Sequence, residues 1–142
     1  MKILGLIAVL CLAVALVGCG EGSSSGETAK LTKPEVDPPP GPPPKKLVIR
    51  DLVEGSGPGA QLGDALTVQY VGVNMKDEEL FSSWTRRRAP LTFALGGGTY
   101  NFPGWEKGLE GMKEGGRREL WIPGYLALGE PLFYVVDLLK IQ

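Results

Sequence analysis

The chain has 142 residues, with 15 basic and 16 acidic side chains, two cysteines and no histidine. The absence of histidine excludes Ser-His-Asp triads, Cys-His pairs and histidine-ligated metal sites. A formal net charge of -1 gives no reason to expect nucleic acid or another polyanion as a partner. We therefore expect no metal, no cofactor and no nucleic-acid ligand.

Residues 1–18 have the pattern of a bacterial export signal. Lys2 precedes an apolar stretch from Ile3 to Val17, which is short for a membrane span but suits the hydrophobic region of a signal peptide. The following Leu-Val-Gly-Cys, ending at Cys19, resembles a lipobox. That resemblance implies cleavage before Cys19, acylation of its thiol with fatty acids such as palmitate, and anchoring to the extracytoplasmic face of the cell membrane. An uncleaved anchor and a plain signal peptide are the alternatives.

Residues 19–46 are predicted to form a tether between the lipidated cysteine and a folded domain. Glycine and serine dominate its first part, which favours flexibility, whereas the prolines of residues 38–44 favour a stiff polyproline II segment. Because both parts are poor in apolar residues, we expect the tether to bury no apolar surface. We interpret the proline run as a spacer. The alternatives are a ligand for an aromatic groove and a substrate of this chain's own domain.

Residues 47–142 are predicted to form a single, monomeric folded domain rich in strands. Alternating apolar residues are typical of half-buried strands, and Leu66, Val68 and Tyr70 share one face. The strand candidates are residues 47–53, 65–73, 79–84, 91–95, 117–122 and 132–139, and the glycine-rich residues 55–59 and 115–116 are predicted turns.

Residues 103–112 have the pattern of one short helix. Pro103 suits the first helical position, and Trp105, Leu109 and Met112 recur on one face. A helix this short, with two internal glycines, is not stable alone, so it must pack against the sheet. The predicted fold class is therefore α+β, with an antiparallel sheet wrapped around one short helix.

Five segments of this domain occur in an order and spacing typical of one known family. They are Val-Gln-Tyr-Val-Gly at 68–72, Leu-Phe-Ser-Ser-Trp at 80–84, Thr-Phe-Ala-Leu-Gly at 92–96, Pro-Gly-Trp-Glu-Lys-Gly-Leu-Glu-Gly-Met-Lys-Glu-Gly-Gly-Arg-Arg at 103–118 and Phe-Tyr-Val-Val-Asp-Leu-Leu-Lys-Ile at 133–141. Together they resemble the FKBP family of peptidyl-prolyl cis-trans isomerases. The resemblance implies a twisted antiparallel sheet curled around a short helix, and isomerisation of X-Pro bonds in exported proteins. It also implies proline-containing polypeptides as partners and macrolides as candidate ligands.

The same resemblance implies a proline-binding pocket between the helix and the sheet. Trp105 would form its floor, Tyr70, Phe81 and Phe93 its walls, and Tyr134 would take the aromatic position on the last strand. The backbone N–H of Phe102 would bond the substrate carbonyl. Further substrate contacts would come from Ser82, Leu91, Asn101 and Leu128. Rotation about an X-Pro bond breaks no covalent bond, so this chemistry needs no nucleophile, metal or general base.

Four departures from the family pattern surround this expected pocket. The pocket aspartate is missing, either replaced by Ser82 or deleted with compensation among the arginines of residues 86–88. Leu91 stands where an aromatic residue is common, and Leu128 stands where the family usually has a tyrosine. Only Glu130 and Pro131 separate Gly129 from the last strand, where the family has a long overhanging loop. We therefore expect a shallower, wetter pocket and weak or absent isomerase activity.

The departures leave a second function open. The alternative to an isomerase is a catalytically degenerate FKBP-fold module that binds proteins or acts as a chaperone. The basic cluster of residues 86–88 is interpreted as a solvated loop rather than as a patch for anionic lipid.

Overall fold

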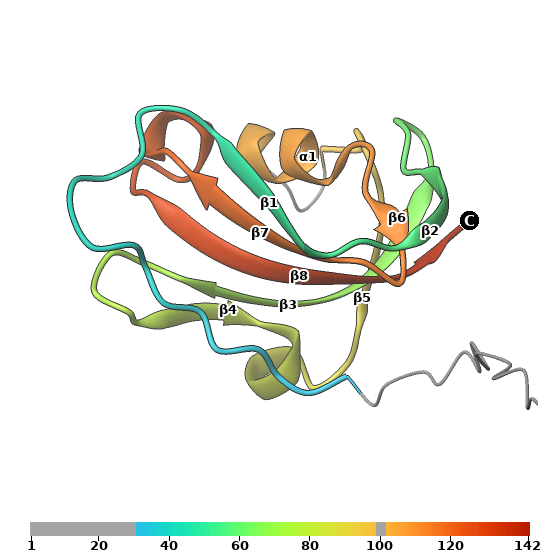
Figure 1. The fold of residues 1–142 in the computed structure, drawn as a ribbon, viewed down its shortest axis with the longest axis horizontal. Coiled ribbons are helices and arrows are strands. Elements are labelled where there is room, and N and C mark those ends of the chain that lie inside the picture. Colours follow the sequence, from blue (N-terminus) through green and yellow to red (C-terminus); the bar gives the residue numbers. More distant parts are fainter. Residues whose placement is uncertain (1–30, 99–101) are drawn as a thin grey trace, which may run out of the picture. The chain divides into compact units, whose positions relative to one another are not determined.

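The computed structural model describes residues 31–98 and 102–142, and its strands form an antiparallel sheet around one α-helix (Figure 1). The strands are β1 (Val48–Val53), β2 (Ser56–Gly59), β3 (Ala65–Val73), β4 (Glu79–Ser82), β5 (Leu91–Ala94), β6 (Lys113–Glu114), β7 (Arg117–Ile122) and β8 (Leu132–Ile141). The helices are α1 (Pro103–Leu109), the π-helix η1 (Ser83–Arg87) and the 3-10 helix η2 (Gly124–Leu126). The predicted α+β class is confirmed.

Three predicted elements differ from the structure. The strand predicted over residues 79–84 ends at Ser82, and Ser83 and Trp84 belong to η1. The helix ends at Leu109, three residues before the predicted end, and Met112 is buried just beyond it. Residues 56–59, predicted as a turn, form β2, which pairs with β6 through Ser56 opposite Glu114 and Gly59 opposite Lys113. A two-stranded ladder built from glycine and proline depends on backbone pairing, so it leaves no side-chain alternation in the sequence.

The main sheet has the strand order β1-β7-β8-β3, and β4 and β5 both pair with β3. β5 pairs with residues 65–68 of β3 and β4 with residues 71–73, so the two short strands follow one another along β3. Leu66 and Val68 are fully buried and Tyr70 is partly buried in one core with α1, as their alternation predicts.

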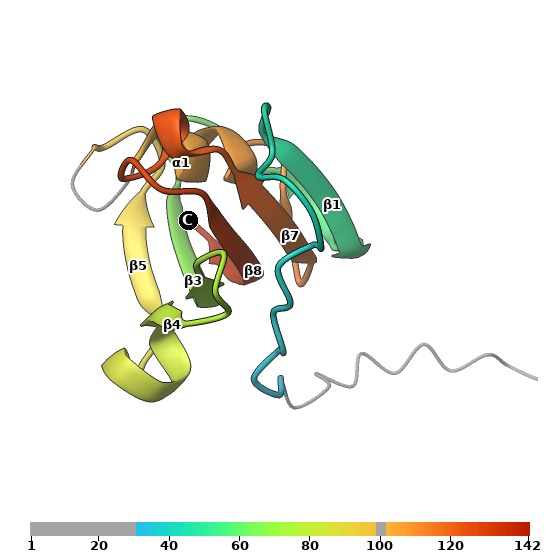
Figure 2. The ribbon, with the colours of Figure 1, turned by 90° about the vertical axis from the view of Figure 1, so that its left-hand side faces the viewer.

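Helix α1 lies against the inner face of the sheet (Figure 2). The predicted stripe is buried, with Trp105 4% exposed. Glycine weakens a helix, but at position 104 the packing requires it, because a Cβ there would lie 2.1 Å from Cγ2 of Ile122 on β7. At the other end, Arg118 donates to the carbonyl oxygens of Gly108 and Glu110 at 3.0 and 3.2 Å. These contacts satisfy carbonyl groups that a helix end leaves unpaired.

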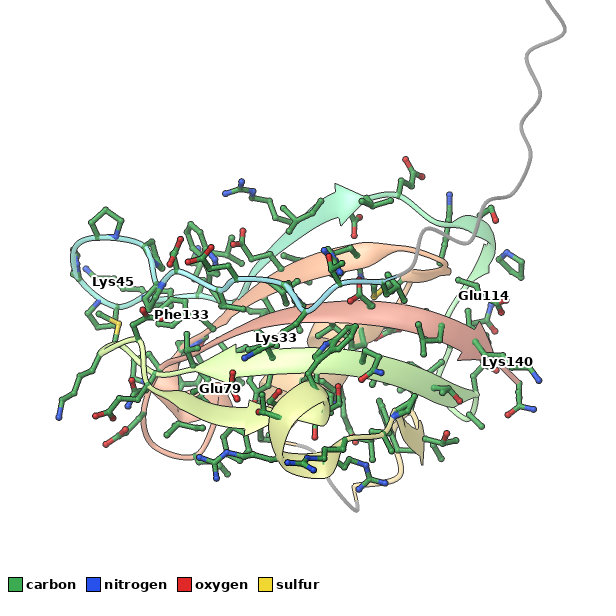
Figure 3. All side chains as sticks on the ribbon, turned by 90° about the horizontal axis from the view of Figure 1, so that it is seen from below. Lys33, Lys45, Glu79, Glu114, Phe133 and Lys140 are labelled. Carbon is green, nitrogen blue, oxygen red and sulfur yellow. The ribbon has the colours of Figure 1, made fainter. Side chains whose placement is uncertain are left out.

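The outer face of the sheet is covered by residues 32–46, here called the strap (Figure 3). Val36 is 6% exposed and packs in a second apolar cluster, whose buried members are Val36, Val71, Val73, Phe133 and Val135. Arg117 also donates to the carbonyl oxygen of Thr32 at 3.0 Å. Burying a valine side chain contributes about 1.5–3 kcal/mol to stability.

The strap corrects the expectation that residues 19–46 bury no apolar surface. The folded unit spans Thr32–Gln142, so the predicted domain start at residue 47 is too late. One valine suffices because strand alternation already places apolar side chains of β3 and β8 on the outer face. The segment's own composition carries no sign of that partner surface. Cys19 and the predicted signal lie outside the described residues.

Candidate functional site

Six aromatic side chains form one cluster between α1 and the sheet. Trp105 makes edge contacts with Tyr70 at a ring-centroid distance of 5.4 Å and with Tyr134 at 5.0 Å. Phe93 lies 6.1 Å from Trp105. Edge-to-face pairs at such distances are favourable because the positive ring edge meets the negative ring face. The structure thus brings together the residues predicted to form the floor and walls.

Tyr134 is the centre of this cluster and is 3% exposed. Besides Trp105, it contacts Phe81 at 6.2 Å in a stacked arrangement and Phe102 at 6.0 Å. Tyr70 lies 6.3 Å away. Trp105 and Tyr134 are buried, whereas Tyr70, Phe81 and Phe102 are partly exposed. A ligand that reaches the cluster would therefore first contact the three partly exposed rings.

The start of α1 positions both Trp105 and Phe102. Phe102 is the N-cap, with an extended backbone (φ -93°, ψ 158°), and Pro103 follows at the first helical position. The Trp105 N–H donates to the carbonyl oxygen of Phe102 at 3.0 Å. Within residues 31–98 and 102–142, the backbone N–H of Phe102 makes no hydrogen bond. It is therefore a donor available to a carbonyl group.

The wall opposite α1 is built by β4 and η1. Ser82, predicted as a substrate contact, is buried, and its hydroxyl accepts hydrogen bonds from the backbone N–H groups of Trp84 and Thr85 at 3.1 and 3.2 Å. It acts as the N-cap of η1, as a serine at a helix start commonly does. A serine hydroxyl carries no charge, so Ser82 does not supply the carboxylate of the family's aspartate, and its contact with substrate stays a prediction.

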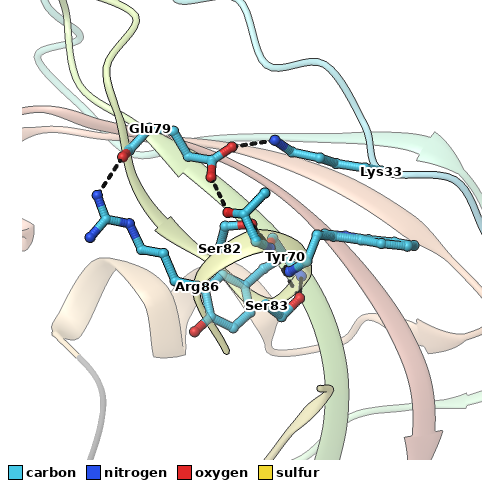
Figure 4. A network of polar contacts seen from close by, with 8 residues as sticks. Lys33, Tyr70, Glu79, Ser82, Ser83 and Arg86 are labelled. Atoms are coloured by element: carbon cyan, nitrogen blue, oxygen red, sulfur yellow. Dashed lines mark hydrogen bonds and ion pairs between the residues drawn. The ribbon is translucent and has the colours of Figure 1, made fainter. Parts of the chain in front are cut away.

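Ser83 is a positioning residue that the sequence analysis missed. Its fully buried hydroxyl accepts from the Tyr70 backbone N–H at 2.8 Å and donates to the side-chain oxygen of Gln69. These bonds fix the backbone of Tyr70 to η1 (Figure 4). No pattern in the sequence pairs Ser83 with Tyr70, because the two residues are 13 positions apart and meet only when β4 folds back on β3.

The remaining predicted contacts have different surroundings. Leu91 is buried in the core as part of β5, and Leu128 is 67% exposed. The segment before β8 is as short as predicted, since β8 begins at Leu132 directly after Pro131. Asn101 lies outside the described residues. Arg86, Arg87 and Arg88 are exposed as predicted, although the first two belong to η1 rather than to a loop.

The electrostatics of the site keep both tyrosine hydroxyls protonated. Burial raises the pKa of Tyr70, an effect opposed by the positive charge of Arg87. Burial also raises the pKa of Tyr134, and the neighbouring Tyr70 adds to that shift. Both hydroxyls therefore remain hydrogen-bond donors at neutral pH.

The cluster can bind an apolar ring but has no groups for covalent chemistry. Within residues 31–98 and 102–142, no group of three His, Cys, Asp or Glu side chains is placed to hold a metal ion. In the same ranges, no helix is long and apolar enough to cross a membrane. What the described side chains do provide is an aromatic surface with a backbone donor at Phe102 and two hydroxyl donors.

Comparison with known proteins identifies the family of this fold. A family model described as FKBP-type peptidyl-prolyl cis-trans isomerase matches residues 57–132. The FK506-binding protein of Streptomyces anulatus is 45% identical over 123 residues, covering 78% of this chain and 98% of that protein. The probable FK506-binding protein of Corynebacterium glutamicum is 38% identical over 121 residues, covering 78% and 99%. A match of 78% of 142 residues is longer than the 96 residues of 47–142, so both similarities extend into the strap.

Solved structures show the same fold. The crystal structure of AtFKBP13 superimposes with a TM-score of 0.63 at 29% identity, covering 70% of this chain and 96% of that one. The crystal structure of FkpA from Escherichia coli gives a TM-score of 0.62 at 33% identity and covers 68% of this chain. This chain spans 48% of the FkpA chain.

Proposed function

Since this chain belongs to the family of FKBP-type peptidyl-prolyl cis-trans isomerases, we propose that the aromatic cluster around Trp105 is its catalytic site. The observation that carries this proposal is a connected set of ring contacts. Tyr134 lies 6.3 Å or less, between ring centroids, from Tyr70, Phe81 and Trp105, and Tyr70 also contacts Trp105. The proline ring of a polypeptide would pack on these residues, with Phe93 and Phe102 completing the apolar surround.

The chemistry follows from the polarity of the amide group. An X-Pro bond rotates over a barrier of about 18–20 kcal/mol because amide resonance is lost in the twisted state. The planar amide is the more polar form, so moving it from water onto a dry aromatic surface destabilises it relative to the twisted form. That difference lowers the barrier without a proton transfer. The N–H of Phe102, which makes no hydrogen bond within the described residues, would hold a substrate carbonyl in place during the rotation.

Reduced activity is part of the proposal. Ser82 is occupied as a helix cap, and Leu128, at the position of the family's tyrosine, is 67% exposed. With only Glu130 and Pro131 between Gly129 and β8, the described segments provide no long loop over the cluster. Water therefore has easier access to the site, which weakens the desolvation effect.

A binding module without catalysis is the second candidate function. The exposed side chains of Tyr125 in η2 and of Leu128 just after it favour this candidate, because they offer apolar contact surface. The substrates of either function would be proline-containing segments of exported proteins. Because two relatives carry the name FK506-binding protein, an FK506-type macrolide is a candidate ligand.

One assay separates the two functions. Isomerisation of a proline tetrapeptide is measured with no protease present, for the full chain and for the Trp105→Ala variant. Weak activity that is lost in the variant supports the isomerase. If the wild type matches the uncatalysed rate but macrolide binding quenches its tryptophan fluorescence, it is a binding module. If it neither catalyses nor binds, both functions are refuted.

Membrane anchoring through Cys19 is a separate proposal that rests on the lipobox resemblance. The mature chain would then act on the extracytoplasmic face of the cell membrane, as a monomer tethered by residues 20–31. Metabolic labelling with a palmitate analogue tests this proposal. Labelled wild type with unlabelled Cys19→Ser supports it, whereas an unlabelled wild type refutes it.

A further inference from the structure

Glu79, at the start of β4, connects the strap to η1 (Figure 4). Its carboxylate accepts hydrogen bonds from Lys33 of the strap and from the hydroxyl of Thr85 in η1. Its backbone carbonyl accepts from Arg86 at 3.1 Å. The bonds from Lys33 and Thr85 are the main reason that the pKa of Glu79 lies below its ordinary value.

An apolar contact joins the same two segments. Trp84, in η1, packs against the outer cluster that contains the buried Val36. The strap is therefore connected to η1 in two ways: through Glu79, which pairs with Lys33 and accepts from Thr85, and through the outer cluster, which includes Val36 and on which Trp84 packs. Both contacts lie on the face of the sheet opposite α1.

The helix η1 in turn supports Phe81 and Tyr70, two of the residues that wall the aromatic cluster. Phe81 immediately precedes its cap and stacks on Tyr134, and Ser83 fixes the backbone of Tyr70. A helical segment of only five residues is not stable by itself, so its position depends on the contacts around it. The strap contributes to two of these contacts, the Glu79 carboxylate that Thr85 bonds and the outer cluster on which Trp84 packs.

We propose that the strap positions the wall formed by Phe81 and Tyr70, with Lys33, Val36 and Glu79 as its positioning residues. This inference rests on the proposed function of the aromatic cluster. A loosened wall is in its binding-competent arrangement for a smaller fraction of the time, which raises the apparent dissociation constant by that fraction. Once substrate is bound, the wall is complete and the rate of rotation is unchanged. The strap thus acts on KM rather than on kcat.

Point variants of the full chain test whether the strap affects KM and not kcat. Lys33→Met removes the ion pair but keeps side-chain length, Val36→Ala removes the apolar contact, and Lys33→Arg keeps the charge. Lys45→Met is the control, because Lys45 is exposed and makes no ion pair within residues 31–98 and 102–142. The readouts are KM and kcat for a proline tetrapeptide, together with near-ultraviolet circular dichroism of the aromatic cluster.

We expect Lys33→Met to raise KM about threefold, in line with the modest strength of partly exposed ion pairs. Val36→Ala should raise KM at least as much, because it removes a buried apolar contact, and both variants should leave kcat unchanged. Lys33→Arg and Lys45→Met should keep the wild-type KM. A lower thermal midpoint with unchanged KM and dichroism would show that the strap only stabilises the fold, and would overturn the proposal. If the wild type has no activity, the proposed function fails, and the dichroism alone decides: unchanged spectra in Lys33→Met and Val36→Ala also refute the positioning role.

Discussion

The variant Gly72→Ala tests whether the packing of Tyr134 determines the shape of the site. Gly72 is buried in β3, opposite Phe81 on β4 and Tyr134 on β8. A Cβ at this position would lie 2.3 Å from Cε1 and 2.6 Å from Cζ of Tyr134. Carbon atoms in normal contact are about 3.5–4.0 Å apart, so in Gly72→Ala the ring must move by about 1 Å.

The cost of that movement follows from the neighbours of the ring. Trp105, Phe102 and Phe81 all contact Tyr134, so it has no open side within the described cluster. Overpacking of this kind costs about 1–3 kcal/mol. Alanine also restricts the unfolded chain, which returns about 0.4–1 kcal/mol when the backbone conformation is allowed. The expected net loss is about 1–2 kcal/mol, or about 4–15 °C in Tm for a domain of this size.

Urea unfolding of a double-mutant cycle isolates the clash. In a Tyr134→Leu background the ring is absent, and Gly72→Ala should then cost less than about 0.5 kcal/mol. In the wild-type background, kcat/KM of the isomerase should fall because the ring moves within the site. Equal losses in both backgrounds, or a Gly72→Ala variant as stable and active as the wild type, would refute this account of the site.

Three further predictions concern charges and hydroxyls. Arg118→Ala should lose about 2–3 kcal/mol in urea unfolding, because this buried guanidinium bonds two carbonyls at the end of α1. The exposed ion-pair variant Arg50→Ala should change stability by less than about 0.5 kcal/mol, and equal losses would contradict the role given to Arg118. The lowered pKa of Glu79 stabilises the fold above the ordinary carboxyl pKa, and this contribution disappears as pH falls through the folded-state value. The stability advantage of the wild type over Glu79→Gln should therefore shrink as pH falls below the ordinary carboxyl range, and an advantage that does not shrink would have another cause. Tyr134→Phe should change stability by less than about 0.5 kcal/mol, since within the described residues the hydroxyl makes no hydrogen bond and is not among the buried polar atoms left without a partner, yet it should lower kcat/KM. Unchanged kcat/KM would mean that this hydroxyl does not contact substrate.

Most of the inner architecture could be predicted from the sequence. Alternation in residues 65–73 and 117–122 gave strands with the observed bounds, and the Trp105, Leu109 and Met112 stripe placed α1 on the sheet. Such local periodicities predict structure because they report which face of an element is buried. The glycine-rich residues 56–59 carry no such periodicity, and their strand was missed.

The role of individual polar residues in the site could not be predicted. Ser82 was expected to contact substrate, but its hydroxyl caps η1. Ser83, its neighbour, holds Tyr70 instead. Two adjacent serines have the same chemistry, and only the direction of each side chain, which depends on how β4 meets η1, assigns their partners.

The family of this protein could be predicted from its sequence. The five segments from Val68 to Ile141 resemble the FKBP family, and that resemblance implies a reaction that needs an apolar surface and no proton transfer. The tertiary structure alone decided where the domain begins. The unbroken apolar run Leu132–Val136 indicates burial on both faces of β8, but it does not say which segment covers the second face. That segment is the strap, because Val36 and Lys33 find partners on β3, β8 and β4 that are distant in sequence and meet only when the sheet has formed.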